Sequence, residues 1–125
     1  MTHSPHAQPE SVWDYPRPPK LEQSLQPVRV EFEGIVIAQS ERAYRLLETS
    51  HPPVFYIPWE DLKQQHFEQS SHRTFCEWKG VANYYSIQVG DRMSENAAWF
   101  YPEISELAKS IENRVAFWKG VNVIE

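Results

Sequence analysis

The sequence predicts a mainly β domain, a compact antiparallel barrel or two-sheet sandwich with one short C-terminal helix. Short runs of β-branched and aromatic residues recur between Gly, Pro and Asn positions, a pattern typical of antiparallel strands joined by turns. Only the stretch from Ile104 to Ile111 repeats apolar residues at i, i+3, i+4 and i+7, which is helical spacing. We therefore expect about eight or nine short strands around one core.

Residues 1–27 have a different composition from the rest of the chain. They contain six of the ten prolines and few aliphatic residues, so burial offsets little of the entropy that ordering would cost. We expect a largely extended N-terminal arm, with Trp13 and Tyr15 able to attach part of it to the domain surface. Residues 28–125 should form a single β domain, because a chain of 125 residues buries one core.

The domain should open with a β-hairpin. Residues 28–32 alternate apolar and polar side chains, Glu33 and Gly34 supply a two-residue turn, and residues 35–38 return. Further strands are expected over residues 43–49, 54–57, 74–78, 81–89 and 94–101. Residues 64–73 are polar and carry no strand prediction.

The C-terminal half should contain a central ribbon and a final hairpin. In the strand over residues 81–89, alternation sends Tyr85 and Ile87 to one face and Ala82 and Tyr84 to the other. The predicted helix follows Pro102 and Glu103. Residues 114–118 and 121–124 should then pair around a turn at Lys119 and Gly120.

Composition and charge narrow the possible partners. A net charge of −5 argues against a nucleic-acid or anionic-membrane partner held by bulk electrostatics. No apolar run approaches the ~20 residues that span a bilayer, and the first residues lack the basic end and apolar centre of a signal peptide. The single cysteine excludes an internal disulfide. We expect a soluble cytoplasmic protein, a monomer or weak homodimer, without a nucleic-acid or membrane partner.

Several short stretches follow one another in a distinctive order and spacing. They are Gly34 with residues 37–43, and residues 52–58, 74–80, 97–102 and 115–117. In these stretches the chain resembles the bacterial domain-of-unknown-function family 427 over residues 28–123. The resemblance implies a β-tent fold, related in architecture to methionine sulfoxide reductase B and to the thalidomide-binding domain of cereblon.

Three observations limit what the resemblance implies. The relatives often hold zinc through paired Cys-x-x-Cys motifs, which this sequence lacks. The family has also been labelled nucleotidyltransferase-like, and no motif in the chain supports that label. Glu77 stands where many members have a proline after the cysteine.

The stretch over residues 74–86 contains the strongest candidate for chemistry. Cys76 and Lys79 are the candidate catalytic residues, because a cation such as Lys79 or Arg42 would favour the nucleophilic thiolate. The alternative is a buried, inert cysteine, since no histidine is obviously placed as its base. Lys79 would pair with a carboxylate or bind an anionic ligand, or else be an ordinary surface lysine.

Five further residues are predicted to bind a ligand. They are Arg42, Glu48, Tyr56, Asp61 and Trp99. Arg42 and Glu48 would lie on one face of a single extended segment, where a structural ion pair is the simpler alternative. The resemblance favours a ligand site, because it includes Arg42 and Glu48 together with the aromatic residues Tyr56, Trp99 and Tyr101, and convergent polar groups in a cleft are the usual form of a binding site.

Metal ions and cofactors are not expected. His51, His66 and His72 lack the spacing of metal ligands, one cysteine cannot build a cysteine-rich zinc site, and no glycine-rich phosphate loop is present.

Two functions stay open. One is a small-molecule-binding domain or enzyme whose cleft takes a small polar or anionic ligand. The other is a noncatalytic interaction module that presents Trp78 or Trp118 to a protein partner. The sequence does not decide whether any reaction is catalysed.

Overall fold

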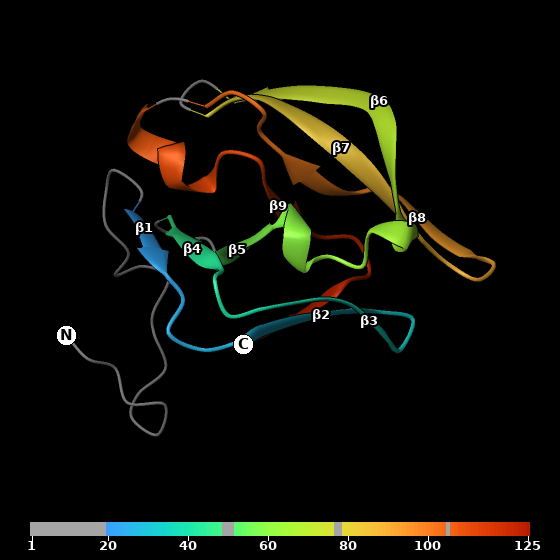
Figure 1. The fold of residues 1–125 in the computed structure, drawn as a ribbon. Helices are drawn as coiled ribbons and strands as arrows, with labels where there is room; N and C mark the ends of the chain where they lie inside the picture. The colour runs from blue at the N-terminus through green and yellow to red at the C-terminus, as the bar shows by residue number, and fades with distance from the viewer. Residues whose placement is uncertain (1–19, 49–51, 77–78, 105) are drawn as a thin grey trace.

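The computed structural model describes residues 20–48, 52–76, 79–104 and 106–125 (Figure 1). Most of the predicted arm, with Trp13 and Tyr15, lies outside the described residues, as does Trp78. The described chain is mainly β and forms two antiparallel sheets that do not close into a barrel. The mainly β prediction is confirmed, and of the two predicted architectures the two-sheet arrangement is the one observed.

The larger sheet has seven strands in the order β1-β4-β5-β9-β8-β7-β6. Their bounds are β1 Lys20–Gln23, β4 Tyr44–Leu47, β5 Val54–Pro58, β9 Arg114–Phe117, β8 Arg92–Phe100, β7 Gly80–Val89 and β6 Phe67–Cys76. Every pairing in this sheet is antiparallel. Strand β9, from the C-terminal part of the chain, is inserted between β5 and β8, so the sheet requires both halves of the chain.

Strand β1 lies within the segment for which an extended arm is predicted. Its residues pair with β4 in the register Lys20 to Leu47 and Gln23 to Tyr44. The guanidinium of Arg45 also contacts the Glu22 carboxylate at 2.7 Å. The ordered β structure therefore begins before Val28.

The smaller sheet has the order β10-β2-β3, with β2 Val28–Phe32, β3 Ile35–Ser40 and β10 Asn122–Ile124. The predicted hairpin between β2 and β3 is confirmed. Glu33 and Gly34 at its turn have φ of 51° and 75°, and two consecutive positive φ values define the type I′ turn that matches the twist of a two-residue hairpin.

The predicted final hairpin is wrong. Lys119 and Gly120 do form a turn with positive φ, but β10 pairs with β2 and not with β9. The reason is that both edges of β9 are already occupied, by β5 and by β8. The chain after Phe117 therefore leaves the large sheet and extends the small one.

The predicted C-terminal helix is present as a short 3₁₀ segment, η4, over Glu106–Ile111. Ala108 has φ −119° and ψ 19°, and this non-helical conformation interrupts the segment before an α-helix can form. The apolar spacing still identified the buried side: Ala108 and Ile111 are fully buried and Ile104 is nearly so. Two shorter 3₁₀ turns are η2 Trp59–Asp61 and η3 Gln64–His66.

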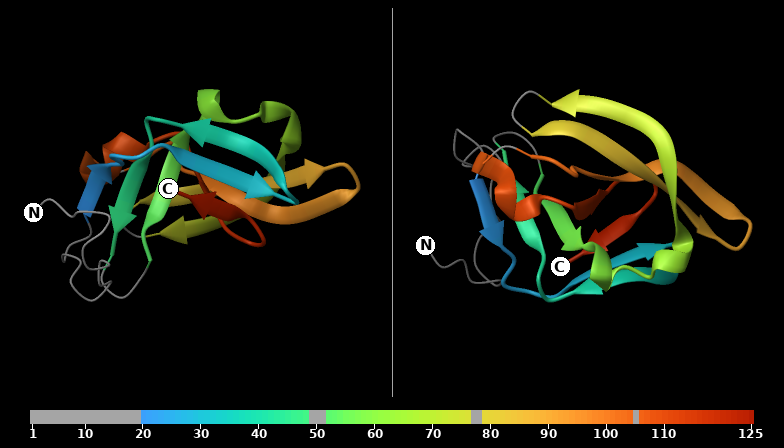
Figure 2. Two further views of the ribbon diagram at one scale, coloured as in Figure 1. Left: turned by 90° about the horizontal axis from the view of Figure 1, so that it is seen from below. Right: turned by 45° about the horizontal axis from the view of Figure 1, so that its top comes forward.

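Two hydrophobic cores lie on opposite faces of the seven-stranded sheet. The first is enclosed between the two sheets and is mostly aliphatic. Its members include Val28, Val30, Ile37, Ile57, Ile87, Ala98 and Val115. The second lies between the other face and η4, and includes Leu46, Tyr56, Ala82, Tyr101, Ile104 and Ile111. Figures 1 and 2 show η4 and the β2–β3 hairpin on opposite sides of the large sheet.

The predicted alternation along β7 is confirmed by these two cores. Tyr85 and Ile87 pack in the first core, and Ala82 and Tyr84 pack in the second. Both faces of β7 are therefore covered between Ala82 and Ile87, whereas Val81 is exposed.

Strand β6 begins at Phe67, so the polar residues before Thr74 are a strand as well. Its pairing with β7 shifts between Gln69 and Arg73, and the pairing of β7 with β8 shifts between Tyr85 and Ile87. The Ser70 hydroxyl donates to Asn96 Oδ1 at 2.6 Å, and the Asn96 N–H donates to Ser86 Oγ at 3.1 Å. These bulges bend β6 sharply (Figure 1).

Candidate functional site

The residues predicted to form one site fall into two groups. We name one group the Cys76 cluster: Glu48, Tyr56, Cys76, Lys79, Tyr84, Trp99 and Tyr101, which gather at the second core. The other group consists of Arg42 and Asp61, which lie beside the first core. Strand β4 separates Arg42 from Glu48, and at about 3.3 Å per residue six extended residues span roughly 20 Å. The structure pairs Arg42 with Asp61 instead of Glu48, which lies in the Cys76 cluster.

The β6–β7 hairpin places Cys76 at the start of the cluster. Cys76 pairs with Gly80 across the hairpin, and its side chain is half-buried against the second core. Gly80 has φ of 108°, and a Cβ there would stand 3.0 Å from the Glu103 carbonyl oxygen. Only glycine fits this conformation and this close approach. The hairpin end is thereby held against the segment that leads into η4.

Lys79 lies at the same end of the hairpin and is 9% exposed. Its Nζ atom stands 5.6 Å from the centroid of the Tyr101 ring, within the range of a cation–π interaction. Tyr101 is itself only 5% exposed. The reading of Lys79 as an ordinary surface lysine is therefore wrong, since the ammonium group is held close to a buried phenol.

Tyr56 and Trp99 form the buried side of the cluster. The indole N–H of Trp99 donates to the Tyr56 hydroxyl at 3.4 Å, and the two rings meet edge to face with centroids 6.5 Å apart. Burial raises the pKa of Tyr56 far above its ordinary value, although the hydrogen bond from Trp99 acts in the opposite direction. Tyr56 is therefore a neutral phenol at physiological pH.

Electrostatic effects place Glu48 in the same neighbourhood. Burial is the main reason why the pKa of Tyr101 is raised well above its ordinary value. The nearby ionisable groups of Cys76, Tyr84 and Glu48 raise the pKa of Tyr101 further. Glu48 and Cys76 act on the pKa of Tyr56 in the same direction. The cluster thus combines the side chains of Glu48, Cys76 and Lys79 with two phenols, Tyr56 and Tyr101, whose raised pKa keeps them protonated.

The sequence predictions did not assign Tyr84 to the site, and they named Tyr101 only as part of the family resemblance. Tyr84 faces Trp99 directly across β7 and β8, and its hydroxyl hydrogen-bonds to that of Thr74 at 2.8 Å. The His72 ring meets Tyr84 with centroids 4.6 Å apart. The alternation of β7 already placed Tyr84 on the face of Ala82, but its partner strand was needed to bring it beside Trp99.

Arg42 and Asp61 form a bidentate ion pair. Nη2 of Arg42 stands 2.9 Å from Oδ1 of Asp61, Nε donates to Oδ2 at 3.3 Å, and the Ser40 hydroxyl donates to Oδ2 at 2.6 Å. Partial burial opposes ionisation of Asp61, but the hydrogen bonds from Arg42 and Ser40 and the Arg42 charge outweigh it and lower the pKa of Asp61. These contacts are largely used within the protein, which favours a structural role for the pair.

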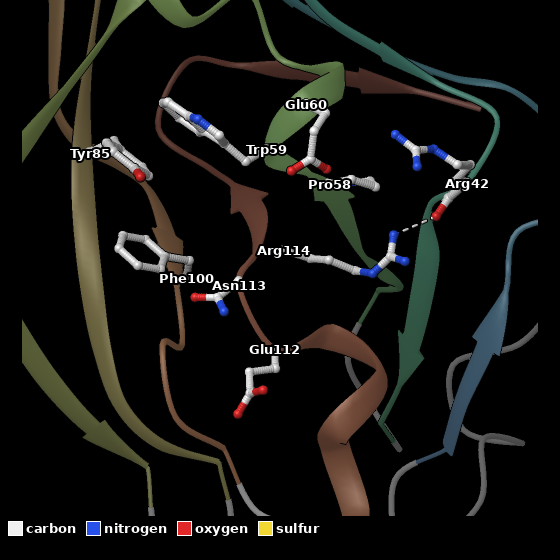
Figure 3. Close-up of a pocket in the computed structure, with 9 residues that line it drawn as sticks. All are labelled: Arg42, Pro58, Trp59, Glu60, Tyr85, Phe100, Glu112, Asn113 and Arg114. Carbon is white, nitrogen blue, oxygen red and sulfur yellow. Dashed lines mark hydrogen bonds between the residues drawn. The ribbon is translucent and has the colours of Figure 1, made fainter.

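Arg42 also separates two hollows in the surface. One, of about 540 Å³, is lined by Pro27, Gln39, Ser40, Glu41, Arg42 and Asp61. The other, of about 440 Å³, is lined by Arg42, Pro58, Trp59, Glu60, Tyr85, Phe100, Glu112, Asn113 and Arg114 (Figure 3). Between the two hollows, the Arg114 guanidinium donates a hydrogen bond to the Arg42 carbonyl oxygen at 2.7 Å. The sequence predictions did not select the other residues of the second hollow, which come from several separate segments.

Within the described segments, no group of three or more His, Cys, Asp or Glu side chains is placed to hold a metal ion. No helix of the described chain is both long and apolar enough to cross a membrane.

The fold and the Cys76 cluster define a mainly β domain with a thiol, an ammonium and several tyrosines on one face of its large sheet. A family model described as a domain of unknown function, DUF427, matches residues 20–124. The chain belongs to this family, and the predicted resemblance is confirmed. The match begins at β1. A search of curated proteins found no match.

Proposed function

We propose that the Cys76 cluster binds a small polar or anionic ligand, with Lys79 as the cation that holds it and Cys76 as the nucleophile. The observation that carries the proposal is the nearly buried Lys79 ammonium, 5.6 Å from the Tyr101 ring, at the hairpin end that also bears the thiol. Charge attraction is several times stronger in such an environment than in water, so one ammonium suffices to orient an anionic group.

The neighbouring groups support this assignment of roles. Neutral phenols are hydrogen-bond donors, and Tyr56 and Tyr101 bring two of them to the cluster. Glu48 supplies a carboxylate close to Tyr56 and Tyr101, which suits proton transfer to or from a bound molecule. A thiolate at Cys76 would be stabilised by the adjacent cation. We extend the proposal to a cytoplasmic protein, a monomer or weak homodimer, whose single thiol stays reduced.

A noncatalytic interaction module is the second candidate. The observation in its favour is a pair of exposed apolar side chains on the outer face of the β6–β7 hairpin: Phe75 is 72% exposed and its cross-strand partner Val81 is 47% exposed. Trp118 is 50% exposed, but its indole N–H is already bonded to the Asn96 carbonyl oxygen at 2.9 Å. Two small patches are less area than a stable protein interface needs.

A thermal-shift screen with small anions tests the proposal. Phosphate, sugar phosphates and short carboxylic acids are suitable probes, because a ligand that binds only the folded state raises the melting temperature. We expect a shift for at least one class, lost in Lys79→Met and kept in Lys63→Met, a change at an exposed lysine. A shift that survives Lys79→Met would remove the cation role. No shift with any probe, together with Phe75-dependent self-association, would favour the interaction module.

A further inference from the structure

The hollow of about 440 Å³ lies on the opposite face of β7 and β8 from the Cys76 cluster. Tyr85 and Phe100 line the hollow and pack with the first core, whereas Tyr84 and Trp99 belong to the cluster and pack with the second. Side chains of neighbouring residues in a strand point to opposite faces. The two places are therefore separated by the sheet, and the hollow has a chemistry of its own.

One wall of the hollow is built from three aromatic rings. Tyr85 stacks on Trp59 with centroids 4.9 Å apart and planes 15° apart, and on Phe100 with centroids 5.0 Å apart and planes 23° apart. Phe67 meets both Trp59 and Tyr85 edge to face. Rings that are held on several sides lose little further freedom when a ligand binds. The wall is a preformed apolar surface, on the left in Figure 3.

The two arginines of the hollow are committed to partners. The Arg42 guanidinium is bound by both oxygens of Asp61. Arg114 donates to the carbonyl oxygens of Ser110 at 2.9 Å and Arg42 at 2.7 Å, and its guanidinium stands 4.9 Å from the centroid of the Tyr44 ring. Neither side chain therefore offers a free guanidinium fork to an incoming anion.

The two carboxylates of the hollow differ from each other. Glu112 accepts from Lys109 Nζ at 3.0 Å and from the Ile104 N–H at 3.3 Å. Glu60 is exposed, and its charge acts on Arg42 and Arg114 without a hydrogen bond or ion pair to either. It extends over the hollow beside Trp59 (Figure 3). The uncommitted charge facing the aromatic wall is therefore negative.

We propose that this hollow is a second binding site, which takes a small aromatic or alicyclic amine in its protonated form. The ring of the ligand packs against Trp59, Tyr85 and Phe100, and its ammonium group pairs with Glu60. Cations are also attracted to the faces of aromatic rings. A volume of about 440 Å³ lies within the range of pockets that hold small organic molecules. This inference does not depend on the function proposed for the Cys76 cluster.

Benzylamine and benzoate are matched probes, because they have the same ring and nearly the same size but opposite charge. Binding is followed by the NMR signal of the Trp59 indole N–H in the full-length protein. We expect benzylamine to shift this signal at millimolar concentration and benzoate to bind at least about threefold more weakly. Glu60→Gln should weaken benzylamine binding at least threefold, and Glu68→Gln, at an exposed carboxylate on β6, should leave it unchanged.

Three results would overturn the proposal. They are the absence of any shift of the Trp59 signal, benzoate binding as tightly as benzylamine, and benzylamine binding that is unaffected by Glu60→Gln. Because Glu60 is exposed, Glu60→Gln should keep the wild-type fold, which the rest of its NMR spectrum verifies. Lys79→Met should have no effect on benzylamine, so failure of this site and failure of the Cys76 cluster are separate outcomes.

Discussion

The two faces of the seven-stranded sheet are covered differently, and their chemistry differs accordingly. The first face is covered by a second sheet, and the buried core between them is largely aliphatic, with the aromatic side chains of Trp59, Tyr85 and Phe100 at its border. The second face is covered by the six-residue segment η4, and its core contains Tyr56 and Tyr101 and borders Cys76, Tyr84 and Trp99. A continuous sheet can be covered by apolar side chains alone. A short segment covers less of the sheet, and hydroxyl, thiol and ammonium groups pack with their partners in the space that it leaves.

Polar groups on the second face are buried together with their partners. The Tyr56 hydroxyl accepts from Trp99, and Lys79 stands over Tyr101. In the described part of the chain, no buried side-chain nitrogen or oxygen lacks a hydrogen-bond partner. Such a network fixes the geometry of its members because breaking one bond leaves another group unsatisfied. The candidate site therefore differs from the first face in having a thin cover, and not in having a poorly packed core.

The largest expected difference between the faces concerns stability. Ile57 in the first core and Ile111 in η4 are both fully buried. Ile57→Ala should cost about 3–5 kcal/mol, because two sheets cannot close the cavity, and Ile111→Ala about 2–3 kcal/mol, because a short segment relaxes more easily. Urea unfolding of both variants measures the difference. Equal losses would show that η4 is as rigid a cover as the small sheet.

Substitution of Gly80 tests how the β6–β7 hairpin is held against the segment that leads into η4, which covers the second face. Gly80→Ala should cost about 1–3 kcal/mol, because its φ of 108° is strained for alanine and the added Cβ would meet the Glu103 carbonyl oxygen at 3.0 Å. Gly90 provides the matched control: its φ is 58° and no atom stands within 4 Å of an added Cβ. Gly90→Ala should cost only about 1 kcal/mol. Similar losses in urea unfolding would mean that the contact with Glu103 is unimportant.

Local features of the fold were predictable from the sequence because a few adjacent residues determine them. Glu33 and Gly34, and Lys119 and Gly120, form turns with positive φ as predicted. The alternation of β7 correctly divided its residues between two faces. The partner of β10 was not predictable, because it depends on whether the edges of β9 are free. The periodicity from Ile104 to Ile111 identified the buried side of the segment, but could not distinguish 3₁₀ from α geometry.

The candidate site was predictable only in part, because individual residues could be selected from the sequence but their neighbours in space could not. Tyr56 and Trp99 were selected individually, and the structure brings both to the face that bears Cys76. Arg42 was expected beside Glu48 because the two are close in sequence, but its partner is Asp61, which comes from η2. The wall of Trp59, Tyr85 and Phe100 is assembled from η2, β7 and β8. No local pattern marks a surface whose members meet only after the sheet has formed.

The two faces should also differ in chemical reactivity, which alkylation of Cys76 tests. The proposed nucleophilic role of Cys76 predicts that iodoacetamide alkylates it in native buffer at neutral pH, at a rate that depends on the Lys79 ammonium. Lys79→Met should slow the reaction about threefold, Lys63→Met should not, and added salt should reduce the difference. Mass spectrometry measures the rate. A thiol that reacts only after unfolding, with normal anion binding by Cys76→Ser, would remove the nucleophile and leave Lys79 as a binding group.

The smallest expected effect belongs to the Arg42–Asp61 pair, which lies beside the first face. The pKa of Asp61 is lowered in the folded protein, below the value of about 3.9 for an unperturbed aspartate. Its contribution to stability is therefore complete above that pH, and is lost as the pH falls through the folded pKa. The Arg42 side chain is 56% exposed, so the contribution should be small and should shrink further at high salt.

Asp61→Asn isolates this contribution. In urea unfolding between pH 6 and pH 2.5, where the carboxyl groups take up protons, the variant should lose less stability than the wild type, and the two curves should converge at the acid end. Glu68→Gln, at an exposed carboxylate of β6, should follow the wild-type curve. Parallel curves for Asp61→Asn and the wild type would mean that Arg42 contributes nothing to stability through this pair, and that its guanidinium is available to a ligand in either adjoining hollow. The committed arginines of the proposed amine site would then be the first assignment to revise.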